Sequence, residues 1–148
     1  MKKLLYLFLI TSVVFISCSK EDDSPSIIGI WTPTSMTTFM EYTVEMAGVT
    51  LASGDTTMTI SANDPEWDMD GDVEFTDDGM MYADGDTSMY EFENGTLTVT
   101  DSDGEVEENA CTVTSTTIEI TFTGQDVDEE QGVTTTSDYT TTITAERN

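Results

Sequence analysis

The sequence has no histidine and very few basic residues. Four Lys and Arg stand against 30 Asp and Glu, which gives a formal net charge of −26 at pH 7. Without histidine, the chain lacks the commonest general base and a common metal ligand. Nucleic-acid binding depends on Lys and Arg that neutralise phosphates, so we expect no nucleic-acid partner. Mutual repulsion between so many carboxylates keeps a protein soluble and favours a monomer.

Cysteines and catalytic motifs are also scarce. The only cysteines are Cys18 and Cys111, so no disulfide framework is expected. Cys111 alternates with Val113 and is predicted to be a small buried side chain. The sequence has no nucleophile elbow, no phosphate-binding glycine loop and no cysteine–histidine pair. A pair of carboxylates can hydrolyse a glycosidic bond. In this sequence, however, acidic residues are abundant and lie mostly in predicted turns, so no particular pair stands out. We therefore predict that the chain is not an enzyme.

The N-terminal segment has the features of an export signal. It begins with Met1, Lys2 and Lys3, continues through an apolar stretch and ends at Ile16-Ser17-Cys18. The apolar stretch is short for a membrane span and polar residues follow it directly. A cysteine in this place resembles the lipobox of bacterial lipoproteins, although Phe15 stands where that family usually has Leu. The resemblance implies a signal peptide over residues 1–17 and acylation of Cys18. The alternative is a plain secretory signal with a coincidental cysteine.

Residues 18–27 are polar and predict a flexible tether, because they cannot bury enough apolar surface to order themselves. The acidic tract over residues 19–23 is similar to the one that follows the acylated cysteine in Bacteroidetes-type surface lipoproteins. That resemblance implies a lipid anchor in the bacterial outer membrane and display at the cell surface. Three acyl chains would hold the protein stably, whereas one holds only marginally. A periplasm-facing orientation is the alternative.

The rest of the chain has the pattern of β-strands joined by tight turns. Threonine is abundant, with 28 residues, and favours strands. Apolar residues alternate with polar ones over residues 36–46 and 118–122, and no segment of a dozen residues has a helical period. Turns are predicted at Ser53-Gly54-Asp55, Asp78-Gly79, Asp84-Gly85-Asp86, Asn94-Gly95 and Asp103-Gly104. We predict an all-β fold, an antiparallel up-and-down β-barrel of about eight strands that leaves no free edge. A β-sandwich is the alternative.

A second resemblance covers residues 28–147. Ile28-Gly29-Ile30-Trp31 resembles the Gly-x-Trp opening of lipocalin-like barrels, and the order of the later strands is similar to that of small lipocalin-like lipoproteins of Bacteroidetes. The resemblance implies a barrel domain over residues 28–148. It also implies that Trp31 packs across the closed end of the barrel, with Arg147 stacked on it as a cation–π contact.

The lipocalin-like resemblance further implies a small apolar or amphipathic ligand. An eight-stranded barrel is either filled by side chains or just wide enough for one ligand. Methionine suits adaptable pockets but also fills irregular cores. The candidate lining residues, for which core packing is the alternative role, are Met36, Met40, Tyr42, Met58 and Phe92.

One acidic segment is a candidate calcium site. Residues 66–77 can be laid on the twelve-residue EF-hand loop, with Gly71 at the turn and Val73 at the apolar position. The candidate ligands are Glu66, Asp68, Asp70, Asp72, Glu74 and Asp77. The first position is Glu rather than Asp, the last is Asp rather than Glu, and flanking helices are missing, so a solvated acidic turn is the alternative. A calcium-stabilised surface interaction protein without a small-molecule pocket is the alternative function.

Overall fold

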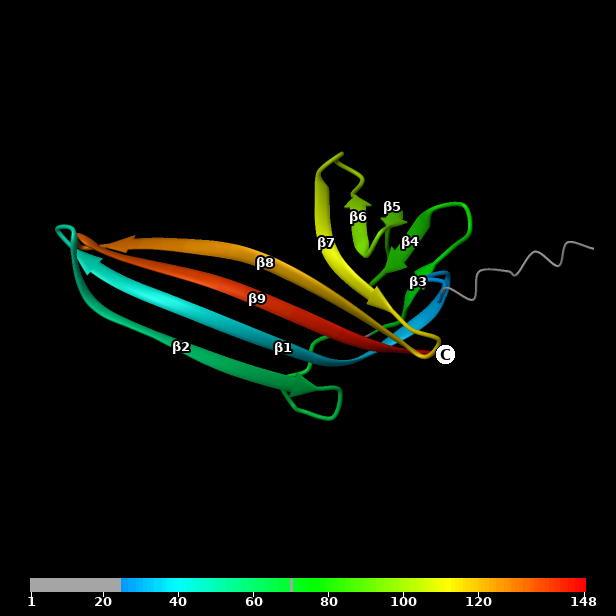
Figure 1. Cartoon of the computed structure of the whole chain (residues 1–148), viewed down its shortest axis with the longest axis horizontal. Coiled ribbons are helices and arrows are strands. Elements are labelled where there is room, and N and C mark those ends of the chain that lie inside the picture. The colour runs from blue at the N-terminus through cyan, green and yellow to red at the C-terminus, as the bar shows by residue number, and fades with distance from the viewer. Residues whose placement is uncertain (1–24, 70) are drawn as a thin grey trace, which may run out of the picture.

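The computed structural model describes residues 25–69 and 71–148, and this part of the chain is built of nine strands without a helix (Figure 1). Within it there is accordingly no helix long and apolar enough to cross a membrane. The strands are β1 (Gly29–Met46), β2 (Val49–Ser61), β3 (Val73–Phe75), β4 (Met80–Ala83), β5 (Asp86–Glu93), β6 (Thr96–Thr100), β7 (Val106–Val113), β8 (Thr117–Glu130) and β9 (Val133–Arg147).

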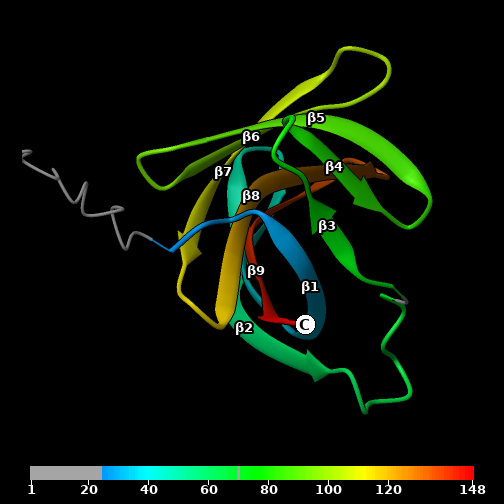
Figure 2. The ribbon, with the colours of Figure 1, turned by 90° about the vertical axis from the view of Figure 1, so that its right-hand side faces the viewer.

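Eight of the strands close into an antiparallel barrel. Each of β3 to β8 pairs with the next strand in the chain, β3 also pairs with the start of β1, and β9 returns to pair with β1. The ninth strand, β2, forms a hairpin with β1 and lies outside the closed ring. Figure 2 turns the molecule so that the barrel end, with β3 to β7, faces the viewer. The predicted all-β, up-and-down barrel is therefore confirmed, and the structure forms it rather than the sandwich. The expectation of no free edge is wrong, because β2 pairs only with β1 and leaves its other edge open.

Two-residue turns with positive φ join four of the hairpins. They are Ala47-Gly48, Asp84-Gly85, Asn94-Gly95 and Gln131-Gly132, with φ of 51–53° at the first residue and 76–88° at the glycine. Such turns match the right-handed twist of the flanking strands, and glycine adopts positive φ without steric cost. The predicted turn at Ser53-Gly54-Asp55 is wrong, because these three residues lie inside β2.

Strand length divides the molecule into a closed end and a projection. Strands β3 to β7 have at most eight residues, whereas β1, β2, β8 and β9 have 13 to 18. The long strands continue past the short ones as a four-stranded sheet in the order β2-β1-β9-β8, which extends to the left in Figure 1. We call this projection the arm; it comprises residues 36–46, 49–60, 120–130 and 133–143.

Side chains fill the closed end of the barrel. Trp31, Phe75, Leu97 and Ile118 are almost fully buried, and Ile27, Cys111 and Ala145 pack with them. The Phe75 and Tyr90 rings meet edge to face with centroids 4.9 Å apart, a favourable aromatic geometry. Burial, together with Asp77 and Asp78, raises the pKa of Tyr90, whose hydroxyl donates to the Thr76 carbonyl at 2.7 Å. The barrel interior is therefore a packed core at this end.

The expected signal peptide, Cys18 and most of the expected tether lie outside the described residues, as does Asp70. The ordered domain begins before residue 28, since Ile27 is only 5% exposed and belongs to the core. Its carbonyl also accepts a hydrogen bond from the Trp31 indole N–H at 2.8 Å.

Candidate functional site

The two faces of the arm differ in chemistry because side chains alternate along each strand. The register aligns Met36 with Ile60 and with Ile143, and Ile143 with Ile120, so that one row is apolar across all four strands. The next row is made of Thr59, Thr37, Thr142 and Thr121. Hydroxyls within it lie 3.0 Å apart (Thr37–Thr59) and 3.1 Å apart (Thr121–Thr142). We call the two sides the apolar face and the threonine face.

The apolar face is a direct continuation of the barrel interior. Ile118 pairs with Ala145, both are buried, and the next residues on the same side are Ile120 and Ile143. Beyond them the apolar face carries Met36, Thr38, Met40, Tyr42, Val44 and Met46 of β1, Met58 and Ile60 of β2, Phe122 of β8, and Val133, Tyr139 and Thr141 of β9.

Much of this face is exposed once it leaves the barrel. Ile60, next to the barrel, is 9% exposed, whereas Tyr42, Met46 and Met58 are 38%, 45% and 50% exposed. Burying apolar surface releases roughly 25 cal/mol per Å², so an uncovered apolar face of this kind favours association with another molecule. A contiguous apolar surface on an otherwise polar protein is the usual mark of a binding site.

Two tyrosines on the apolar face lie over glycines of the outer strands. A Cβ built on Gly54 of β2 would stand 2.8 Å from the Tyr42 hydroxyl, and one on Gly124 of β8 would stand 2.3 Å from that of Tyr139. Each ring therefore covers the backbone of the neighbouring strand, an arrangement that compensates for a glycine in a sheet. The rings spread toward opposite edges, because Tyr42 leans from β1 to β2 and Tyr139 from β9 to β8.

The barrel wall opens where β7 leaves β8. Their pairing extends only from Val113–Ile118 to Ala110–Thr121, and β8 continues without β7 from Phe122 onward. A hollow of about 340 Å³ lies at this opening, lined by Phe122 and Tyr139 from the arm and by Glu107, Glu108 and Asn109 from β7. Asn109 is 8% exposed and is the buried polar residue of the described chain. This opening, the barrel mouth, places a polar amide beside the start of the apolar face.

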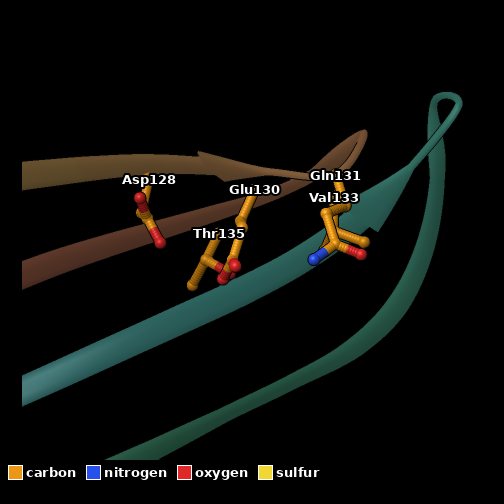
Figure 3. Close-up of a pocket in the computed structure, with 5 residues that line it drawn as sticks. All are labelled: Asp128, Glu130, Gln131, Val133 and Thr135. Carbon is orange, nitrogen blue, oxygen red and sulfur yellow. The ribbon is translucent and has the colours of Figure 1, made fainter.

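A second hollow, of about 350 Å³, lies near the tip of the arm. Asp128, Glu130, Gln131, Val133 and Thr135 line it. Figure 3 shows the Asp128, Glu130 and Thr135 side chains on the same side of the sheet. The register aligns Asp126 with Ser137, Asp128 with Thr135 and Glu130 with Val133, which places all three carboxylates on the apolar face. We call Asp126, Asp128 and Glu130 the acidic margin of that face.

The structure brings together four of the five candidate lining residues. Met36, Met40, Tyr42 and Met58 share the apolar face, while Phe92 lies apart on β5 and packs against the barrel core. Sequence reasoning did not assign Phe122, Tyr139 and Asn109 to the site. The alternation around Phe122 and Tyr139 was visible in the sequence, but nothing local indicated that Asn109 would be buried at the barrel mouth.

Trp31 and Arg147 are in direct contact at the closed end. The guanidinium carbon of Arg147 lies 4.2 Å from the centre of the Trp31 ring. Its Nη1 donates to the Ile28 carbonyl at 2.9 Å, and its Nη2 donates to the Ser26 carbonyl. Gly29 leaves room for this arrangement, because a Cβ there would stand 2.9 Å from Nη1. The last strand is thereby fixed to the chain that enters the first.

The acidic segment 66–77 does not form a ligand cluster within the described residues. Asp72 accepts hydrogen bonds from the Thr32 hydroxyl at 2.5 Å and from the Asn148 amide at 3.0 Å, and Glu74 lies in β3. Across residues 25–69 and 71–148, no group of three or more acidic or cysteine side chains could hold a metal ion. Asp70 lies outside that part, so calcium binding stays a prediction.

Comparison with known proteins gave no relative: no family model matches the chain, and no curated protein or solved structure matches it. The closed eight-stranded barrel is compatible with the lipocalin-like fold.

Proposed function

We propose that this protein is a lipid-anchored bacterial surface lipoprotein that binds an apolar or amphipathic ligand on the apolar face of its arm. The observation that carries the binding role is the continuity of that face with the barrel core. Packed side chains close the barrel at the Trp31 end, and the same interior surface runs out along the arm uncovered. A ligand laid on this surface would be held between the barrel mouth and the tip, not inside a closed cavity.

A neutral apolar fluorescent probe, N-phenyl-1-naphthylamine, tests the binding role. Met40→Glu puts a charge in the centre of the apolar face, and we expect the affinity for the probe to fall by about tenfold or more, since the charge must be desolvated under a ligand. Phe39→Glu is the matched control, because Phe39 is the neighbouring residue of β1 on the threonine face and is 39% exposed. Equal losses in the two variants would overturn the assignment of the face.

The anchoring role rests on the lipobox-like end of the N-terminal segment at Cys18. Cells grown with labelled palmitate should label the wild-type protein and leave a Cys18→Ala variant unlabelled. Protease added to intact cells then reports the orientation: digestion of the barrel domain is expected for surface display. Protection of the domain until the outer membrane is broken would place it in the periplasm.

A further inference from the structure

We infer that the occupant of the apolar face is a cationic amphipathic peptide segment, whose apolar side covers β1 and β9 and whose Lys or Arg side chains meet the acidic margin on β8. This inference rests on the proposed binding role and names the chemistry of the partner. It follows from three properties of the arm: the placement of its charges, the lack of any cation to pair with them, and the dimensions of the face.

The acidic margin runs, row by row, alongside the apolar-face side chains of β1 from Met36 to Met46, which we call the apolar strip. Asp126 lies on the same row as Tyr42, Asp128 on the row of Val44, and Glu130 on the row of Met46, with one residue of β9 between each pair. Neighbouring strands are about 4.8 Å apart, so each carboxylate stands about 10 Å from the apolar side chain of its row. A partner that buries the strip therefore meets a line of negative charge along one flank.

The described part of the chain has no cation beside the acidic margin. Residues 21–146 contain no Lys, Arg or His. Arg147 is held over Trp31 at the opposite end of the molecule. A second copy laid face to face would bring another apolar strip together with another set of carboxylates, and like charges across an interface oppose association. Charge complementarity thus selects a different, positively charged molecule.

The dimensions of the face fit one helix-length segment. From Met36 to Met46 the strip advances ten residues along β1, which corresponds to about 33 Å at 3.3 Å per residue. An α-helix covers that length with about 22 residues and is about 10 Å wide. The four strands of the arm span about 14 Å between the axes of the outer two. Packing a helix on such a sheet would cover the exposed Tyr42, Met46 and Met58 in one step.

A designed peptide series on the purified full-length chain tests the inference by calorimetry. Three 22-residue peptides share one leucine stripe and carry Lys, Gln or Glu on the remaining positions. We expect the Lys peptide to bind about tenfold or more tightly than the Gln peptide at low salt and the Glu peptide to bind most weakly, because the carboxylates favour only the cation. Exposed pairs are screened by salt, so most of this advantage should disappear at about 0.5 M NaCl.

Two charge-matched triple variants locate the interaction. Asp126→Asn/Asp128→Asn/Glu130→Gln neutralises the acidic margin, whereas Glu41→Gln/Glu119→Gln/Glu129→Gln removes the same charge from the threonine face. The first should lose about tenfold in affinity for the Lys peptide and the second at most about twofold, because short-range pairing outweighs the overall field at moderate salt. The two variants should unfold at closely similar temperatures, because each removes three negative charges.

Each contrary outcome overturns one specific claim. Equal losses in the two triple variants would mean attraction to overall charge and would overturn the acidic margin as the binding site. Equal binding of the Lys and Gln peptides, with the neutral probe still bound, would overturn the cationic partner and leave the proposed function standing. Loss of neutral-probe binding from the wild type would overturn the proposed function itself. Full binding of the Lys peptide to Met40→Glu would show that the peptide lies elsewhere.

Discussion

Burial in the filled end of the barrel determines the protonation of the Cys111 thiol. Cys111 is 4% exposed, and burial raises the pKa of its thiol from 9.0 to about 11. A thiol that is protonated in this way is a poor nucleophile, so its role in the native protein is packing.

The same shift gives a pH dependence of stability. Between pH 9 and about 11 the unfolded thiol is ionised and the buried one is not, so the free energy of unfolding should fall as pH rises, by up to about 1.4 kcal/mol per pH unit. Below pH 9 this loss is absent. Urea unfolding at pH 8 and pH 10 should show a larger drop for the wild type than for Cys111→Ala, which lacks the thiol. Parallel drops in the two proteins would contradict the assignment.

At the scale of the element, the stability of the outer strands β2 and β8 depends on tyrosine rings from the inner strands β1 and β9, which cover their glycines. Gly124→Ala places a methyl group where the Tyr139 ring lies and should cost about 1–3 kcal/mol through overpacking. In a Tyr139→Ala background the same change should be neutral or favourable, since alanine is better than glycine within a strand. A double-mutant cycle by urea unfolding measures this coupling. An additive result would mean that the ring does not lie over Gly124 in solution.

The two free edges of the arm are protected unequally. Beyond its pairing with β7, β8 carries Asp126, Asp128, Glu129 and Glu130, whereas β2 has only Asp55 among residues 49–61 and no proline. Charges on an edge strand oppose edge-to-edge pairing. Asp55→Asn should therefore shorten the lag of aggregation followed by light scattering at moderate ionic strength. Asp126→Asn, with the same loss of charge, should leave the lag close to that of the wild type; equal shortening would implicate net charge instead of the β2 edge.

The elements also show which parts of the fold could be predicted from the sequence. The alternation over residues 36–46 predicted a strand with one apolar side, and Asn94-Gly95 predicted a hairpin, because both signals are local. Gly54 suggested a turn, but it lies inside β2, where the ring of Tyr42 takes the space of a side chain. The turns at Ala47-Gly48 and Gln131-Gly132 lack an Asx residue and gave no signal. The uncovered apolar face depends on β7 leaving β8 at Thr121, which is a tertiary event that no short pattern encodes.

At the scale of the whole molecule, the net charge of −26 sets the response to ions. Repulsion between carboxylates destabilises the compact state, so the melting temperature should rise as NaCl screens them. Scanning calorimetry in NaCl, and then in calcium or magnesium at equal ionic strength, separates screening from specific binding. A calcium-specific rise is what a site over residues 66–77 requires, because an ion that binds only the folded state stabilises it by mass action. Equal effects of the two divalent ions would contradict such a site.

The pairing of β1 with β9 joins the two ends of the domain, from Trp31 beside Arg147 to Met46 beside Val133. These contacts are remote in sequence, and such topologies fold slowly because long loops must close before the contacts form. Strand β9, which pairs with β1 along most of its length, is the last strand of the domain to be synthesised. A nascent chain therefore cannot close its barrel until Arg147 has left the ribosome, so the ring forms only after the whole domain has been made.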